Sequence, residues 1–259
     1  MSPEQHHEFV LEDYAMHHVL NGREWHLPFL PPIHLPPFLS LHGLMVLLCA
    51  AFLIIIFCIS YNKKARVPHG LTNFLEMVVV FIRDEIAVAM LGPEEGIRMT
   101  PLFCTFFFFI LGMNLTGLIL PIFSTATANV NVTGALACVT LGFMVFGTIY
   151  KNGWNGFVHA LVPQGVPWPL LLLLVPLEFL GLFIKAFALM IRLFANMLAG
   201  HIAIFSLIGL VGLFGYVALP AIAMAVFVSL LEIFIAFLQA YIFTMLSAMF
   251  MGLMYHPEH

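Results

Sequence analysis

Long apolar runs dominate the pattern of this chain. Runs close to the roughly twenty residues that a bilayer core requires cover residues 41–61, 101–120 and 134–150. Two longer runs follow, at 168–215 and 216–255. Helices accommodate such excess apolar length by tilting or bending. The pattern therefore predicts an all-α polytopic membrane protein with about five membrane-crossing or strongly tilted helices.

Two stretches depart from this pattern. Residues 1–40 are polar and rich in proline and histidine, so we expect an extended or irregular segment outside the bilayer. Over residues 70–98, apolar positions recur at helical spacing but charged residues interrupt them. This stretch forms either an amphipathic helix at the membrane surface or a short span, and Gly92-Pro93 ends it. Three glycines offer a turn between the last two runs, namely Gly209, Gly212 and Gly215.

The composition agrees with a membrane protein. Of 259 residues, 62% are hydrophobic and 8% are charged, whereas a soluble domain carries about 25% charged residues. The formal net charge is −4 and no Lys/Arg-rich run occurs, so no nucleic-acid partner is expected. The first forty residues are acidic and lack a basic region followed by an apolar core, so no cleavable signal peptide is expected. The four cysteines lie in apolar runs without metal-ligand spacing, and we interpret them as buried hydrophobic residues: Cys49, Cys58, Cys104 and Cys138.

Basic residues predict the orientation of the spans. Lys63, Lys64 and Arg66 directly follow the first run, and Lys151 ends another. Positive charge favours the cytoplasmic or matrix side, while the uncharged loop 121–132 suits the opposite side. An odd number of crossings then places the N-terminus outside and the C-terminus in the cytoplasm.

Arg192 is a charge in the middle of an apolar run. A guanidinium stays protonated at physiological pH. A charge at the centre of a membrane helix costs about 2.5–3.5 kcal/mol on insertion scales. No carboxylate lies within one helical turn of Arg192 in the sequence, so its counter-charge must come from elsewhere, such as another chain. Ion transport is therefore the first functional hypothesis.

Several polar residues of the last two runs share helix faces. Glu178, Lys185 and Arg192 are spaced by seven, which places them on one stripe of a helix. Asn196 lies about 40° round from Arg192, and His201 lies about 180° from it. Glu232 and Gln239 are again seven apart. A purely structural interpretation is open for three pairs. Glu178 and Lys185 can form an ion pair within one helix. Asn196 with Gln239, and His201 with Glu232, can form hydrogen bonds between helices.

The same residues also suit a proton path. Histidine ionises near neutral pH, and a carboxyl in apolar surroundings holds its proton more firmly than in water. Both groups can therefore take up and release protons. Arginine cannot relay protons, but it favours the ionised form of a carboxyl that approaches it and can block a leak of protons.

The residues around Arg192 resemble a known signature. Residues 192–201 read RLFANMLAGH, which is similar to the pattern R-L-F-x-N-M-x-A-G of subunit a of the F-type rotary ATP synthase. Ala195 stands where a glycine is common in that pattern. Residues 238–243, LQAYIF, resemble the family's second signature, L-Q-A-[FY]-[IV]-F. Residues 114–121 and 128–133 resemble the end of its third helix and the following loop, and the resemblance extends from residue 41 to the C-terminus.

The resemblance implies roles for individual residues. Arg192 would be the essential arginine that faces the carboxylate of the rotating c-ring, flanked by Asn196 and Gln239. His201 and Glu232 would line an aqueous half-channel, with the two residue types exchanged relative to many family members. Further members of the proton-translocation set are Glu178, placed in the exit half-channel, and the possible accessory residues Lys185, Asn131 and Asn114.

The resemblance also implies an architecture and partners. The membrane domain would cover residues 41–259, and its tilted helix pair at about 168–255 would form the ion path that couples proton flow to ring rotation. The expected partners are the c-ring of proteolipid subunits, the peripheral-stalk subunit b, other ATP synthase subunits and membrane lipid. We expect no cofactor, no metal and no nucleotide site, since no phosphate-binding glycine loop occurs. The expected location is the bacterial inner membrane, or alternatively an energy-transducing organelle membrane.

Two other classes of function are open from the residues alone. A self-contained ion-coupled secondary transporter would show discontinuous helices in two related halves, and no such halves are visible. A polytopic membrane enzyme would need a nucleophile–base set or a metal cluster at membrane depth, which His201 and Glu232 alone do not make.

Overall fold

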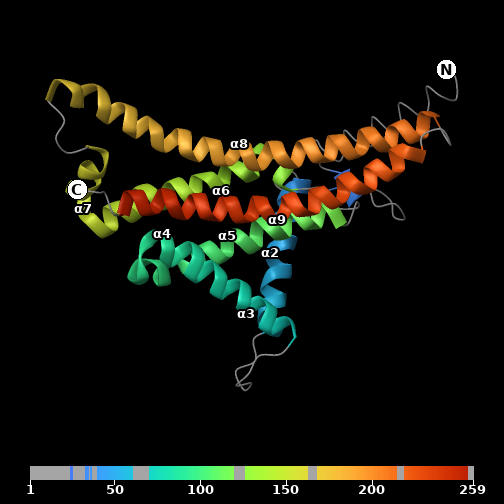
Figure 1. Cartoon of the computed structure of the whole chain (residues 1–259), viewed down its shortest axis with the longest axis horizontal. Helices are drawn as coiled ribbons and strands as arrows, with labels where there is room; N and C mark the ends of the chain where they lie inside the picture. The colour runs from blue at the N-terminus through green and yellow to red at the C-terminus, as the bar shows by residue number, and fades with distance from the viewer. Residues whose placement is uncertain are drawn as a thin grey trace. The chain divides into compact units, whose positions relative to one another are not determined.

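The fold is a set of long helices. The computed structural model describes residues 24–25, 33–34, 36, 40–60, 70–119, 126–162, 168–214 and 219–255. Its long helices, labelled in Figure 1, include α2 (Leu41–Ser60), α5 (Pro93–Ile119), α8 (Trp168–Phe214) and α9 (Leu219–Tyr255). The strands in the described part, β1 (Glu24–Trp25) and β2 (Ile33–His34), have two residues each and pair antiparallel. The all-α fold class is confirmed.

Five helices in the described residues are long and apolar enough to cross a membrane. They cover Leu41–Ser60, Pro93–Leu118, Val130–Leu161, Pro169–Val211 and Pro220–Tyr255. Many of their large apolar side chains are exposed, among them Ile59, Phe146 and Leu172. Apolar side chains that face outward from long helices are expected where lipid is the solvent. The predicted number of crossings is confirmed.

The stretch between the first two spans is one nearly continuous helix of three elements. These are α3 (Leu71–Phe81), the π-helix η1 (Ile82–Val88) and α4 (Ala89–Leu91). The stretch is not among the five candidate spans of the described residues, which favours the surface helix over the short span. The helix ends at Gly92, as predicted, because Gly92 adopts φ 81°, a left-handed conformation that favours glycine.

Helix α5 begins earlier than predicted. The apolar run predicted a start at Pro101, but the helix begins at Pro93 and carries Pro101 in its interior. Proline suits the first helical position because it has no N–H group to leave unsatisfied. Glu94 and Glu95 follow in the first turn, where negative side chains interact favourably with the helix dipole and stabilise the helix. These local signals extend the helix beyond its apolar part.

The next span is also longer than predicted. It was expected at 134–150, but α6 (Val130–Gly142), the π-helix η3 (Phe143–Gly147) and α7 (Thr148–Leu161) follow one another without a gap. The side-chain Oδ1 of Asn129 accepts the backbone N–H of Asn131 at 2.9 Å, which is an N-cap hydrogen bond. This cap starts the helix inside the predicted loop 121–132, of which residues 121–125 lie outside the described part.

Helix α8 continues where a turn was predicted. Gly209 and Gly212 lie within the helix, which ends at Phe214, and Gly215 falls outside the described residues. Lys63, Lys64 and Arg66 also fall outside them, as does most of segment 1–40. The orientation that these basic residues predict, and the position of segment 1–40 outside the bilayer, stay predictions.

The chain divides into two compact units. The first unit comprises Met1–Ile54, Phe109–Thr133 and Arg192–Gln239, and the second comprises Ile55–Phe108, Gly134–Ile191 and Ala240–His259. In the second unit, the Tyr255 hydroxyl at the end of α9 donates to the Phe143 carbonyl at 3.3 Å. A side chain at Gly147 would lie 2.8 Å from the Tyr255 ring atom Cζ, so glycine permits this close packing. These contacts fix the end of α9 against η3.

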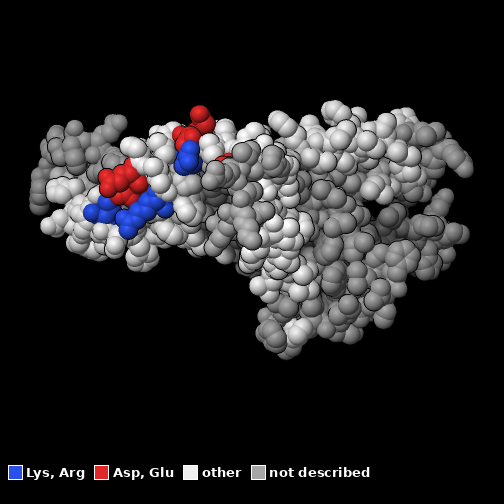
Figure 2. All heavy atoms as spheres, turned by 90° about the horizontal axis from the view of Figure 1, so that it is seen from below, with Lys and Arg blue, Asp and Glu red and all other residues white. Residues whose placement is uncertain are grey.

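Charged side chains gather on one part of the face drawn in Figure 2. In the second unit, Arg83 donates to Asp84 from Nε at 2.7 Å and from Nη2 at 3.0 Å. These hydrogen bonds hold the pKa of the exposed Asp84 carboxyl below its usual range. Lys151 Nζ lies 3.9 Å from Glu95 Oε1 in the same unit.

Candidate functional site

Five predicted site residues of the first unit lie on α8 and α9, namely Arg192, Asn196, His201, Glu232 and Gln239. These helices run side by side there, as Figure 1 shows and as side-chain contacts between them confirm. Buried apolar residues of α8, such as Leu193 and Met197, lie on the side that packs inward. Because one helical turn holds about 3.6 residues, Asn196 and His201 fall on the two edges of that buried stripe. Both can therefore reach α9.

Asn196 and Gln239 join the two helices. The Asn196 Nδ2 donates a hydrogen bond to the Gln239 Oε1 at 2.7 Å. Gln239 is only 3% exposed, and its Nε2 has no hydrogen-bond partner among the described residues. A buried amide N–H group without a partner costs free energy. The hydrogen bond to Asn196 therefore satisfies the Gln239 oxygen but not its buried N–H groups.

His201 and Glu232 form a second pair between the helices. The His201 Nδ1 lies 2.9 Å from the Glu232 Oε1 and 3.0 Å from the Met197 carbonyl oxygen. The ring nitrogen is aligned with the carbonyl oxygen of Met197, whereas neither carboxylate oxygen of Glu232 has an aligned hydrogen-bond donor in the described part. The contact with Glu232 is therefore a close charge pairing, which forms fully when the imidazole is protonated.

Glu232 is buried, with 3% of its surface exposed. A carboxylate in such surroundings is costly unless a cation or a hydrogen-bond donor lies beside it. The His201 imidazole occupies that position. The pair therefore places an imidazole and a carboxyl side by side within an apolar helix pair.

Gly200 makes room for this pair. A methyl group at position 200 would lie 2.7 Å from the Glu232 carboxyl carbon Cδ and in contact with Oε1. Glycine in a helix interior costs about 1 kcal/mol relative to alanine, so its presence calls for a packing reason. The motif at residues 192–201 includes Gly200, but the sequence did not predict its contact with Glu232. The signal that could have found it is a helical glycine directly before a polar residue.

Arg192 lies four residues before Asn196 on α8 and is partly exposed. In the described part of the chain, no carboxylate lies within ion-pair distance of its guanidinium, and no hydrogen bond to it occurs. Neighbouring polar groups of the first unit, by contrast, pair across α8 and α9. The positive charge of Arg192 is therefore the uncompensated group of this set.

Glu178 and Lys185 lie on the part of α8 that belongs to the second unit. No ion pair joins them in the described structure, so that structural interpretation is wrong. Glu178 is exposed, and the Lys185 Nζ lies 5.7 Å from the ring centre of Phe250 on α9. At a spacing of seven residues the two side chains are about 10 Å apart along the axis, which is too far for a contact. The aromatic face of Phe250 supplies Lys185 with an alternative partner.

Of the two accessory asparagines, Asn114 has a side-chain partner close to it in the fold. Asn114 is buried, and its Oδ1 accepts the Thr127 hydroxyl at 2.7 Å. The Asn131 side chain is exposed. Neither shows a hydrogen bond to the polar residues of α8 or α9 within the described residues, so an accessory role stays a prediction.

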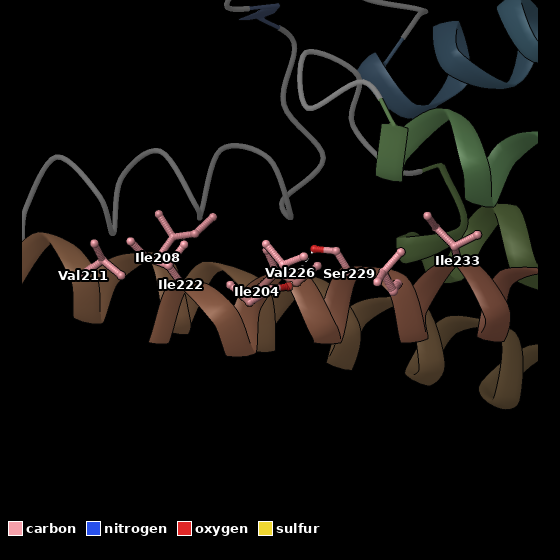
Figure 3. A pocket seen from close by; sticks show the side chains of 9 residues that line it. Ile204, Ile208, Val211, Ile222, Val226, Ser229 and Ile233 are labelled. Atoms are coloured by element: carbon pink, nitrogen blue, oxygen red, sulfur yellow. Dashed lines mark hydrogen bonds between the residues drawn. The ribbon is translucent and has the colours of Figure 1, made fainter. Parts of the chain in front are cut away.

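An apolar crevice of about 400 Å³ lies between α8 and α9 in the first unit (Figure 3). Ile204, Ile208, Ile222 and Ile233 are among its lining residues, and Ser229 is its polar residue. The Ser229 hydroxyl donates to the Ala225 carbonyl of its own helix at 2.9 Å. The crevice thus offers no free polar group to a soluble ligand. Among the described residues, no three His, Cys, Asp or Glu side chains come together in a metal-binding group.

Comparison with known proteins gives one consistent family. Residues 43–252 match the family described as ATP synthase A chain. The chain is 48% identical to ATP synthase subunit a of Anaeromyxobacter dehalogenans strain 2CP-C over 224 residues, which cover 84% of this chain and 58% of that protein. It is 43% identical to ATP synthase subunit a of Chloroherpeton thalassium over 262 residues, covering 95% and 78%. For the same subunit of Myxococcus xanthus the identity is 45% over 228 residues, covering 84% and 75%. The chain spans somewhat more than half the length of the Anaeromyxobacter relatives.

Proposed function

We propose that this chain, which belongs to the ATP synthase A chain family, is the proton-translocating stator subunit of the Fo membrane sector. The family match confirms the resemblance to subunit a that the motifs indicated. Five helices among the residues that the structure describes are long and apolar enough to cross a bilayer, so the chain is a multi-pass membrane protein. The alternative of a self-contained secondary transporter has no observation in its favour.

The uncompensated charge of Arg192 carries this proposal. Its guanidinium has no ion-pair partner in the described chain, although it lies in an apolar helix where an unpaired charge is costly. A carboxylate on a neighbouring subunit would remove that cost. The c-ring of the rotary ATP synthase brings such carboxylates past the stator one after another. Arg192 therefore favours the ionised form of each ring carboxyl that reaches it and forces release of its proton.

His201 and Glu232 act on the proton before or after this step. They line one aqueous half-channel, in which the imidazole and the buried carboxyl exchange a proton over 2.9 Å. Asn196 and Gln239 hold α8 and α9 together beside Arg192 through their side-chain hydrogen bond. Glu178, exposed further along α8, belongs to the other half-channel.

Proton flow then turns the ring. A ring carboxyl takes a proton from one half-channel, crosses the lipid in its neutral form, and loses the proton near Arg192 to the other half-channel. Because Arg192 cannot itself release a proton, it prevents a direct leak between the two half-channels. The partners in this arrangement are the c-ring, the peripheral-stalk subunit b, the other ATP synthase subunits and the surrounding lipid.

Substitution of Arg192 tests the proposal. Proton-driven ATP synthesis is measured in vesicles that hold the assembled complex with Arg192→Ala, alongside a matched Arg83→Gln control. Arg83 is an exposed arginine that pairs with Asp84, so its loss should leave synthesis unchanged. We expect Arg192→Ala to abolish synthesis while the subunit stays in the membrane at its normal level. Retained coupling in Arg192→Ala would refute the role assigned to this residue.

A further inference from the structure

The helix from Val130 to Leu161 is longer than a bilayer core. Its 32 residues correspond to about 48 Å at 1.5 Å per residue, whereas the hydrocarbon core is about 30 Å thick. The part up to Lys151 already spans about 33 Å. The residues that follow must therefore leave the hydrocarbon or tilt strongly.

The helix changes direction at Gly153. Gly153 adopts φ 72° and ψ 176°, which interrupts the helical conformation inside α7. Such a conformation favours glycine, and among the described residues no atom beyond the adjoining chain lies within 4 Å of the space that a side chain would take there. Figure 1 shows the end of α7 turning out of the line of α6. Residues 154–161 thus form a separate short helical segment of the second unit.

This segment presents three different faces. Phe157 and Leu161 are buried in the second unit, and Phe157 lies 6.0 Å from the Trp154 ring between ring centres. Trp154 is 67% exposed, and Val158, one turn later, is also exposed. Asn155 and His159 occupy a polar exposed face beside them. One face therefore packs on protein, one is apolar and open, and one is polar.

Charged and aromatic residues lie at the same end of the span, which indicates that this end reaches the polar layer of the membrane. Lys151 approaches Glu95 of α5 at 3.9 Å. The Arg98 guanidinium carbon of α5 lies 6.0 Å from the ring centre of Tyr150, which is 81% exposed. Charged side chains gather in this way at the ends of membrane spans, where the headgroup layer begins. Tyrosine and tryptophan are enriched in that layer, because each has an apolar ring and a polar tip.

We propose that residues 154–161 form an interfacial helix whose open face, Trp154 and Val158, lies in the headgroup and carbonyl layer of the phospholipid bilayer. The polar face of Asn155 and His159 then meets headgroups and water, and Phe157 and Leu161 attach the segment to the protein. The segment anchors the end of the Val130–Leu161 span at a fixed depth. This inference goes beyond the proposed function, since it requires only that the chain crosses a membrane.

The depth of Trp154 can be measured by fluorescence. The sequence holds three tryptophans, Trp25, Trp154 and Trp168. The full chain with W25F and W168F therefore reports on Trp154 alone. It is reconstituted into phosphatidylcholine vesicles that carry a spin label either near the carbonyl groups or near the end of the acyl chain. We expect the shallow label to quench Trp154 about twofold more strongly than the deep label, because tryptophan lies at the headgroup level.

A matched control comes from Phe146, which is 73% exposed on the same span. With W25F, W154F and W168F, the variant Phe146→Trp places a reporter eight residues before position 154, on the far side of the bend at Gly153. This reporter should be quenched most by the deep label. Circular dichroism of both proteins confirms that the helices are retained. Three outcomes would overturn the proposal: Trp154 follows the profile of Phe146→Trp, it responds only to a water-soluble quencher, or it responds to no quencher because protein covers it.

Discussion

The carboxyl group of Glu232 on α9 lies against the backbone of Gly200 on α8, where a methyl group would lie 2.7 Å from Cδ. This close approach brings Oε1 of Glu232 within 2.9 Å of Nδ1 of His201, the next residue on α8. The absence of a side chain at position 200 thus sets the geometry of the proposed proton-exchanging pair. The packing of two helices and the chemistry of the pair depend on the same residue.

Substitution of Gly200 by alanine is expected to displace Glu232. Overpacking of this kind costs about 1–3 kcal/mol, which exceeds the gain of about 1 kcal/mol from replacing glycine in a helix. We expect proton-driven ATP synthesis to fall together with the stability of the chain in detergent. Gly181→Ala is the matched control on α8, because no described atom outside the helix's own backbone lies within 4 Å of the space its methyl group would take. If Gly200→Ala and Gly181→Ala behave alike, Gly200 does not position Glu232.

Exchange of His201 and Glu232 tests whether the two residues act as a pair. Each single change, H201E or E232H, places two like groups together. It should reduce proton transport by roughly tenfold or more, because a buried charged group then loses its partner. The double exchange H201E/E232H keeps one imidazole and one carboxyl at the same contact. It should therefore impair ATP-driven proton pumping less than either single change. Equal loss in the double and single variants would count against pairing.

The hydrogen bond between Asn196 and Gln239 should stabilise the contact of α8 with α9 by about 0.6–2 kcal/mol, the range found for interhelical hydrogen bonds in membranes. A double-mutant cycle of N196L and Q239L, followed by unfolding of the full chain in mixed micelles, measures this coupling. We expect the double variant to lose less stability than the sum of the single variants. Strict additivity would mean that the 2.7 Å contact contributes no coupling free energy.

The spans and the shared faces of polar residues could be predicted from the sequence, because both follow from the geometry of a single helix. Glu232 and Gln239, seven residues apart, do face the same neighbour, since they contact His201 and Asn196 of α8. Helix ends were less predictable. Pro93 and Asn129 start helices through local signals that the apolar pattern does not contain.

Contacts that depend on how two helices meet could not be predicted from one helix at a time. Lys185 has Phe250 of α9 as its neighbour and not Glu178 of its own helix. The room that Gly200 leaves for Glu232 depends on the separation of α8 and α9. The Tyr255 hydroxyl donates a hydrogen bond to the carbonyl of Phe143, which is distant in the sequence. Helix periodicity gives the direction of a side chain, but not the rotation and distance of the helix it meets.

The central claim is that the counter-charge of Arg192 belongs to another subunit, and a cross-link tests it most directly. Ala199 is exposed on α8 about 20° from the face of Arg192, whereas the partly exposed Phe194 lies two residues from Arg192 and about 160° from that face. In the assembled complex, with the four cysteines of this chain replaced, either Ala199→Cys or Phe194→Cys is combined with a cysteine beside the mid-membrane carboxyl of the ring subunit. On oxidation, we predict a disulfide-linked pair of the two subunits for Ala199→Cys and none for Phe194→Cys. A cross-link from Phe194→Cys but not from Ala199→Cys would contradict the claim, because the ring would then face the side of α8 away from Arg192.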